Sequence, residues 1–284
     1  EPRILQATKR LVNESDVVPV LLGNPERIKI YLEIEGITEG FEIIDPAHYD
    51  KYDEMVGAFV ERRKGKVTEE QAHELLKDVN YFGVMLVYMG VVEGMVSGAI
   101  HSTASTVRPA LQIIKTEPGV SKTSGAINID PDAQTLAEIA INSARTAKMF
   151  GIDPKVAMLS YSTKGSGAGP KVDKVVEATK IAQKLRPELD LDGELQFDAA
   201  FVPTTGKLKA PGSKVAGQAT VFIFPGISAG NIGYKIAERM GGFAAVGPVL
   251  QGLNQPVNDL SRGCNPDDVY NLTLITAVQA LEHR

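Results

Sequence analysis

Short apolar runs, each followed by a helical pattern, recur along the chain and restrict its fold more than any other feature. Residues 17–23 ("VVPVLLG") and 219–226 ("ATVFIFPG") are continuous apolar runs, typical of strands buried on both faces. A helix is predicted to begin at Asn24-Pro25 after the first run, and another follows the second. Such alternation without a hairpin-rich block predicts an α/β fold with mainly parallel sheets, covered by helices on both faces.

The length of the chain allows two domains. Its 284 residues, 43% of them hydrophobic, can bury more than one core. Residues 115–125 ("KTEPGVSKTSG") are polar and rich in turn formers, as expected of a hinge. The last strand is predicted at residues 244–252 ("AAVGPVLQG").

Charge and residue usage exclude several classes of protein. The net charge of −5, without a long run of Lys or Arg, argues against nucleic acid or an anionic membrane as the partner. The longest apolar candidate, residues 83–100, is interrupted by Glu93 and four glycines, so no spanning helix is predicted. A single cysteine, Cys264, fits a reducing cytoplasm. The four histidines form no ligand-spaced pair, so no metal site is predicted.

The C-terminal stretch "LSRGCNPDDVYNLTLITAVQAL", residues 260–281, predicts a helix preceded by a polar loop. Asn265 is expected to be the N-cap and Pro266 the first helical residue. The apolar stripe of this helix is predicted to consist of Leu272, Ile275, Val278 and Leu281.

The approach to this helix is a candidate anion site. Free N–H groups and the positive end of the helix dipole favour an anion beside Ser261, and Arg262 adds a forked donor. The alternative is purely structural, because Asp267 and Asp268 in the first turn are ordinary partners of the helix dipole. The local pattern leaves both interpretations open.

Two further loops carry similar groups. In residues 101–115 ("HSTASTVRPALQIIK"), hydroxyls including that of Ser102 precede Arg108, and Pro109 is expected to open a helix. Here a hydroxyl-capped helix start with Arg108 in a surface ion pair is an equally good interpretation. After the strand at 219–226, a predicted helix start places candidate binding groups where doubly wound folds keep their binding loops. These groups are Asn231, Tyr234 and Lys235.

Together, several stretches resemble the phosphate acetyltransferase (phosphotransacetylase) family, over nearly the whole chain. They are "VSGAIHSTASTVRPALQIIKT", "LAEIAINSARTAKMFGIDPKVAMLSYSTKGS", "DGELQFDAAFVP" and "GNIGYKIAERMGGFAAVGPVLQGLNQPVNDLSRGC". The resemblance implies acetyl transfer between CoA and inorganic phosphate, with CoA as a substrate and no tightly bound cofactor. It implies two α/β/α domains of the isocitrate/isopropylmalate dehydrogenase-like type, with the active-site cleft between them, in a homodimer. The expected domains are 1–120 with 253–284, and 121–252.

The resemblance also assigns roles to residues. Arg262 matches the arginine that holds the phosphate, Ser261 the serine that supports the transition state, and Asp268 the carboxylate that takes the proton of the CoA thiol. The matching positions of the phosphate pocket are Arg62, Ser102 and Arg108. A base suits this chemistry, because only the thiolate of CoA is a useful nucleophile.

Alternatives remain for mechanism and function. A covalent acyl-cysteine on Cys264 is the rival to direct transfer in a ternary complex; the resemblance favours direct transfer, with Cys264 a small packed residue. The alternative functions are phosphate butyryltransferase and a regulatory domain without turnover, like the C-terminal module of malic enzyme. Ser261, Arg262 and Asp268 together argue against the regulatory domain, and the matches "GNIGYK" and "LSRGC" favour the acetyl enzyme over the butyryl enzyme.

Two departures from the family pattern stand out. The family ordinarily carries a further apolar stretch between the positions of Gly125 and Ala126, and an initial strand before Glu1. Ser105 stands where the family loop commonly has Asp, which alters the charge of that pocket.

Overall fold

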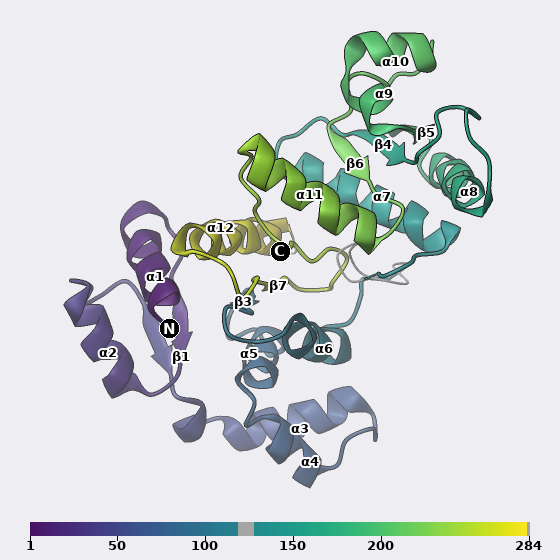
Figure 1. The fold of residues 1–284 in the computed structure, drawn as a ribbon. Helices are drawn as coiled ribbons and strands as arrows, with labels where there is room; N and C mark the ends of the chain where they lie inside the picture. Colours follow the sequence, from purple (N-terminus) through teal and green to yellow (C-terminus); the bar gives the residue numbers. More distant parts are fainter. Residues whose placement is uncertain (119–127, 283–284) are drawn as a thin grey trace. The chain divides into compact units, whose positions relative to one another are not determined.

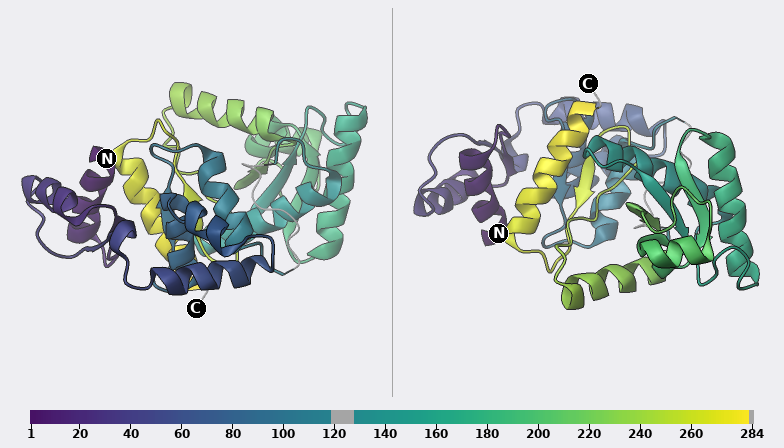
Figure 2. Two further views of the ribbon diagram at one scale, coloured as in Figure 1. Left: turned by 90° about the horizontal axis from the view of Figure 1, so that it is seen from below. Right: turned by 90° about the horizontal axis from the view of Figure 1, so that it is seen from above.

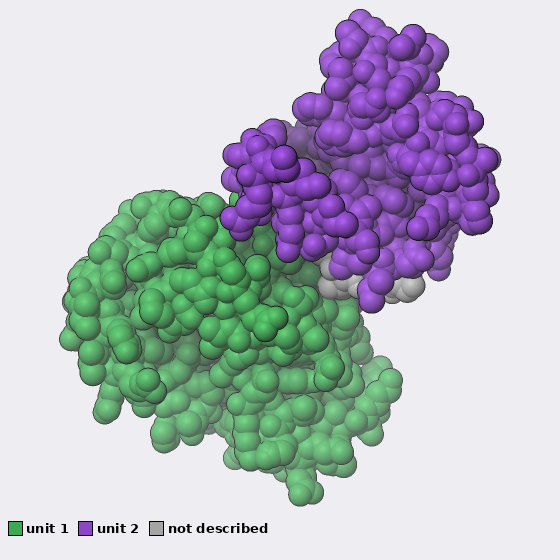
Figure 3. Space-filling view, in the orientation of Figure 1, with its two compact units in different colours: residues 1–115, 246–284 green, residues 116–245 purple. Residues whose placement is uncertain are grey.

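A computed structural model describes residues 1–118 and 128–282 and divides the chain into two compact units (Figures 1 and 3). Unit 1 comprises Glu1–Lys115 and Val246–Arg284, and unit 2 comprises Thr116–Ala245. Each unit has parallel strands with helices packed on them, which confirms the predicted α/β class. The domain limits expected from the sequence remain a prediction, and the junction of Gly125 and Ala126 lies outside the described residues.

Unit 1 contains two pairs of parallel strands. Its strands are β1 (Val20–Leu22), β2 (Glu42–Ile44), β3 (Met95–Ser97) and β7 (Val257–Asp259); β1 pairs with β2 and β3 with β7. Its helices are α1 (Pro2–Glu14), α2 (Pro25–Ile34), the 3₁₀ turn η1 (Pro46–His48), α3 (Tyr52–Arg63), α4 (Glu69–Leu75), α5 (Val79–Tyr88), α6 (Thr103–Ile113) and α12 (Pro266–Glu282). As predicted, Asn24 caps α2, its side chain accepting a hydrogen bond from the N–H of Arg27.

Unit 2 is built on a three-stranded parallel sheet in the order β5-β4-β6. Its elements are α7 (Ala133–Met149), β4 (Lys155–Leu159), α8 (Pro170–Leu185), β5 (Asp190–Leu195), α9 (Phe197–Phe201), α10 (Pro203–Lys209), β6 (Val221–Ile223) and α11 (Ile227–Gly241). Val156 and Met158 of β4 share an apolar cluster with α7 and α8, whereas Ala157 and Leu159 pack in another with Ala200 of α9 and with Ala210, which follows α10. The alternation of side chains along a strand thus gives the sheet a helix-covered core on each face.

The predicted strand at residues 244–252 is wrong. These residues form no strand, and the strand near the C-terminus is β7 at Val257–Asp259. Pro248 lacks the N–H that a ladder needs, which disfavours a strand in the predicted segment. β7 carries Asn258 and Asp259, both fully buried, so hydropathy gave no signal for it.

The predicted helix start at Pro109 is also wrong. α6 begins at Thr103, and Pro109 lies inside it. Ser102 is the N-cap, and its hydroxyl accepts a hydrogen bond from the N–H of Ser105 at 3.3 Å. The serine cap starts the helix two turns before the proline.

α12 is the central helix of unit 1 and lies beside α1 (Figure 2). It starts at Pro266, as predicted, but its buried face differs from the predicted stripe: Leu281 is 63% exposed, whereas Thr276 and Gln279 are buried. The reason is a polar cluster, in which the side-chain amide of Asn258 donates to Thr276 Oγ1 at 2.8 Å and to Gln279 Oε1 at 2.6 Å. Hydrogen bonding allows these polar side chains to occupy the core.

Asp259, the last residue of β7, is a buried carboxylate that lacks good partners. Its side chain has no exposed surface, and neither oxygen has hydrogen-bond geometry with a described protein group. Burial raises the pKa of this carboxyl, while the hydroxyls of Thr103 and Thr106 and the charge of His101 act in the opposite direction. Burial without hydrogen-bond partners thus makes the charged form of this carboxyl costly to stability where α6 begins.

Among the described residues, no helix combines the length and the apolar character needed to cross a membrane.

We expect Asp259→Asn to stabilise the protein near neutral pH, on the order of 1 kcal/mol, because it removes an unpaired buried charge with little change in shape. A raised pKa favours folding when the carboxyl is protonated. That contribution is present below the usual pKa of 3.8 and is lost as pH rises through the higher folded value. Urea unfolding across this range should show the advantage of the Asn variant growing with pH. The exposed Asp16 provides the control Asp16→Asn; an advantage for Asp259→Asn that does not change with pH would contradict this account.

Candidate active site

Two polar loops of unit 1 leave the β3–β7 pair at the same edge. The strands run parallel with Ser97 opposite Asp259, and the N–H of Leu260 donates to Ser97 O at 2.6 Å. Because parallel strands end at a common edge, the loop 98–102 before α6 and the loop 260–268 before α12 start side by side. Both were predicted as candidate binding loops.

Gly98 keeps the two loops in close contact. Its φ of +108° is unfavourable for residues with a side chain. A Cβ atom there would lie 2.5 Å from Asp259 Oδ1 and 2.5 Å from the carbonyl oxygen of Leu260. The first turn away from β3 therefore requires glycine for both reasons.

Ser102 and Ser105 form a hydroxyl pair at the N-terminus of α6. Their Oγ atoms lie 2.8 Å apart, and Ser102 is exposed. Ser105, which stands where the resemblance expects Asp, therefore supports the capping serine. The pair leaves a neutral, hydrogen-bonding helix start beside the loop 260–268.

Ser261 and Arg262 project from the loop 260–268 as exposed residues. The Oγ of Ser261 accepts from the N–H of Gly263 at 3.2 Å, and the N–H of Cys264 donates to the Ser261 carbonyl at 2.9 Å. The loop is thus a tight turn closed by its own serine. The side chain of Arg262 forms no ion pair with the described residues, so its guanidinium is available to an anion.

Asp268 and Asn265 cap α12 reciprocally. The N–H of Asn265 donates to Asp268 Oδ2 at 2.8 Å, and the N–H of Asp268 donates to Asn265 Oδ1 at 2.9 Å. This confirms Asn265 as the N-cap. Asp267 points elsewhere, accepting from Arg10 on α1 at 2.6 Å. The capping bond holds one carboxylate oxygen of Asp268 and leaves its Oδ1 without a bond to the described residues.

Cys264 is a buried thiol, 6% exposed. Burial raises its pKa, and the nearby negative charges of Asp268 and Glu1 act in the same direction, against the opposite influence of Arg3. A raised pKa keeps the sulfur protonated, which disfavours it as a nucleophile. These observations favour the packed role over the acyl-cysteine.

Arg62 lies at the other end of α6. Its Nε donates to the carbonyl of Ile113 at 2.5 Å and its Nη2 to that of Ile114 at 3.0 Å. The 11-residue helix is about 16 Å long, so this guanidinium is far from the cap at Ser102. The structure therefore does not bring Arg62 to Ser102.

Arg108 lies between these two ends of α6 and is exposed. Arg108 stands six positions after Ser102, which corresponds to about 9 Å along the helix axis. Burial raises the pKa of Tyr81, and the positive charges of Arg108 and Arg63 oppose that rise. Arg108 forms no ion pair with a described residue, so the surface ion pair weighed from the sequence is absent there.

Asn231, Tyr234 and Lys235 belong to unit 2. They lie in the second and third turns of α11, which begins at Ile227, so the predicted helix start at these residues is wrong. All three are exposed, and Lys235 Nζ lies 5.9 Å from the centre of the Tyr234 ring. Side chains of α11 are thus free to contact a ligand.

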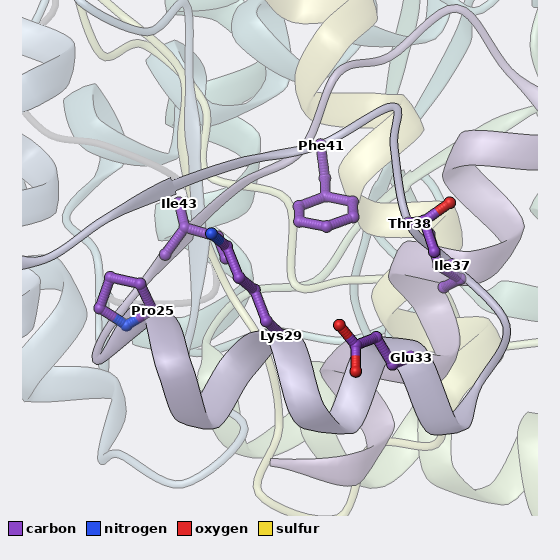
Figure 4. Close-up of a pocket in the computed structure, with 7 residues that line it drawn as sticks. All are labelled: Pro25, Lys29, Glu33, Ile37, Thr38, Phe41 and Ile43. Carbon is purple, nitrogen blue, oxygen red and sulfur yellow. The ribbon is translucent and has the colours of Figure 1, made fainter.

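A groove on α2 and β2 contains none of the predicted site residues (Figure 4). It is lined by Pro25, Lys29, Glu33, Ile37, Thr38, Phe41 and Ile43. Within residues 1–118 and 128–282, no three His, Cys, Asp or Glu side chains lie close enough together to hold a metal ion.

Two residues beside the loops, Asp259 and Arg3, were not predicted from the sequence as site residues. Asp259 stands two positions before Ser261, and a charged residue directly before a polar loop was the available signal. Arg3 contacts both loops from α1, but it lies 259 positions from Arg262 in sequence, so no local pattern could identify it.

Comparison with known proteins identifies the family of this chain. A profile described as phosphate acetyl/butaryl transferase matches residues 1–126 and 122–277. The phosphate acetyltransferase of Bacillus subtilis (strain 168) is 58% identical over 298 residues, covering 99% of this chain and 92% of the relative. A phosphotransacetylase structure from Streptococcus pyogenes has a TM-score of 0.94 and 58% identity, over 99% of this chain and 92% of that one.

A more distant structure shares the fold alone. The branched-chain phosphotransacylase from Enterococcus faecalis V583 gives a TM-score of 0.63 at 20% identity, over 93% of this chain and 99% of that one. The two profile segments meet at residues 122–126, the region of the Gly125 and Ala126 junction. Together the full-length matches show that the chain belongs to the phosphate acetyl/butaryl transferase family.

Proposed function

We propose that this protein transfers an acetyl group between CoA and inorganic phosphate, interconverting acetyl-CoA plus phosphate with acetyl phosphate plus CoA. The observation that carries the proposal is the loop 260–268, with exposed Ser261 and Arg262 next to the carboxylate of Asp268. The 58% identity to a phosphate acetyltransferase supports the same reaction.

Transfer is direct, within a ternary complex. When CoA attacks acetyl phosphate, Asp268 takes the proton of the thiol, sulfur bonds to the acetyl carbon, and the bond from that carbon to phosphate oxygen breaks. The proton rests on Asp268, and phosphate leaves with the bonding electrons. The reverse reaction retraces these steps, and Asp268 returns its proton to the leaving thiolate.

Ser261 and Arg262 stabilise charge as the reaction proceeds. Negative charge grows on the carbonyl oxygen during attack and on phosphate as it leaves. A hydroxyl and a guanidinium fixed beside these atoms stabilise both, and the turn closed by Ser261 limits their reorganisation. The free charge of Arg262 suits the phosphate.

The remaining predicted residues contribute to substrate binding in this proposal. Ser102 at the cap of α6 and the exposed charge of Arg108 bind phosphate or the anionic part of a substrate. Arg62 belongs to this set only if it leaves the carbonyls that it now contacts. The side chains assigned to CoA on unit 2 are Asn231, Tyr234 and Lys235.

The protein acts as a cytoplasmic homodimer, with small-molecule substrates, no tightly bound cofactor, and neither nucleic acid nor membrane as a partner. An exposed apolar stripe on α11, formed by Ile232, Ile236 and Met240, supports association with a second copy. Four-residue spacing places these side chains on one helix face.

Wild-type protein should consume acetyl-CoA in the presence of phosphate, measured as loss of thioester absorbance. Butyryl-CoA should react at least about tenfold less efficiently, because two extra methylenes must fit an acetyl pocket. Equal or better turnover of butyryl-CoA would reassign the protein to longer acyl chains. Absence of turnover with either substrate would contradict the proposed enzyme function and favour a regulatory domain.

Asp268→Asn should lower kcat by about 10²–10⁴-fold, since the side-chain oxygen that caps Asn265 is kept while the base is lost. The matched control is Asp267→Asn, which removes the neighbouring charge that pairs with Arg10 and should stay close to wild type. Steady-state kinetics on both variants tests the assignment. Full activity in Asp268→Asn would remove it from the role of base.

Cys264→Ala should keep kcat within about threefold of wild type, because a protonated, buried thiol takes no part in direct transfer. Thermal unfolding provides the control for lost packing. A Cys264→Ala protein that unfolds like the wild type yet has no turnover would instead establish the acyl-cysteine route.

A further inference from the structure

Arg3, in the first turn of α1, donates hydrogen bonds to both loops of the proposed active site and to Glu1. Nη1 donates to the carbonyls of Arg262 and Cys264, both at 2.9 Å, and Nη2 donates to the carbonyl of Ala99 at 2.9 Å. Nε and Nη2 also bind the carboxylate of Glu1, at 2.8 and 3.2 Å. These contacts satisfy the five N–H groups of the guanidinium.

The three carbonyls belong to the two loops that leave β3 and β7. Ala99 lies in the loop 98–102, which leads to Ser102, whereas Arg262 and Cys264 lie in the loop 260–268. One planar group thus ties both loops together. A lysine could not do so, because its ammonium is a compact point charge without the fork.

The two carbonyls in the loop 260–268 are parts of peptide units that hold proposed catalytic side chains. The unit that joins Cys264 to Asn265 binds Arg3 through its carbonyl and Asp268 Oδ2 through its N–H. The unit that joins Arg262 to Gly263 binds Arg3 through its carbonyl and Ser261 Oγ through its N–H. Because a peptide unit is planar, fixing its carbonyl also fixes its N–H.

The charge of Arg3 is already neutralised. Its hydrogen bond lowers the pKa of Glu1 to about 2, against the opposing effect of burial, so the pair stays ionised at neutral pH. A guanidinium bound to a carboxylate and three carbonyls has no donor left for a substrate. These contacts indicate that Arg3 holds the two loops in place and does not bind phosphate.

We propose that Arg3 is a positioning residue, which orients Ser261 and Asp268 through these two peptide units and locks the loop 260–268 to the loop 98–102. This inference rests on the proposed function for its catalytic consequence, whereas the effect on the loop is independent of turnover. Cys264, the single cysteine, lies inside the locked loop with its Sγ 3.5 Å from Arg3 Nη1. Its reactivity therefore reports whether the loop is closed.

Arg3→Ala should lower kcat by about 10–100-fold, because small misplacements of reacting groups are costly. KM for CoA and acetyl phosphate should change less than about threefold, since no substrate contact is lost. Labelling of Cys264 by a disulfide reagent, without substrate, should accelerate at least about tenfold as the loop opens. Methylguanidinium added to Arg3→Ala should restore part of kcat and slow the labelling.

The matched control is Arg10→Ala on the same helix. Arg10 binds the side chains of Glu14 and Asp267 and lies 3.8 Å from the centre of the Tyr270 ring, without contacting the loop backbone. This variant should keep wild-type kcat and labelling. Arg3→Lys keeps the charge and the aliphatic stem, so it should still lose kcat, and it decides the question if Arg3→Ala does not fold.

Wild-type kcat and labelling in Arg3→Ala and Arg3→Lys would overturn the proposal. So would a rise in KM with kcat unchanged, which would make Arg3 a substrate contact. Should the wild type show no turnover, the proposed function fails, and the labelling rates alone then decide whether Arg3 holds the loop.

Discussion

The parallel pairing of β3 with β7 is the interaction on which the candidate site depends. Only three residues pair on each strand, and the N–H of Leu260 extends the ladder by one bond to Ser97. That short ladder brings together segments more than 150 positions apart in sequence. Because both strands end at the same edge, the caps of α6 and α12 become neighbours there.

The polar loops and helix starts at this edge could be predicted from the sequence, whereas the strand β7 and the buried face of α12 could not. The cap at Asn265, the first helical residue Pro266 and both polar loops follow from local rules about helix starts. β7 does not, because Asn258 and Asp259 make it polar and only tertiary contacts bury it. The buried face of α12 was misjudged for the same reason, since Thr276 and Gln279 face Asn258 and hydropathy places them outside.

Arginines show a second limit of sequence reasoning. The family resemblance implies a cluster of arginines around a phosphate, yet Arg3 and Arg62 donate most of their hydrogen bonds to backbone carbonyls. Arg262 and Arg108 instead keep their charge exposed and unpaired by the described residues. An arginine side chain binds a ligand only if backbone carbonyls do not already accept its hydrogen bonds. Which carbonyls lie within reach is set by the tertiary fold.

The arrangement of α6 has a consequence for local unfolding. Its N-terminus is capped by Ser102, and its last carbonyls, at Gln112, Ile113 and Ile114, accept bonds from Arg63 and Arg62. A helix normally frays from ends whose polar groups bond only to water. Because polar groups at both ends of α6 are hydrogen-bonded within the protein, we expect its amides to exchange more slowly than those of a helix that frays, including at the helix start beside the loop 260–268.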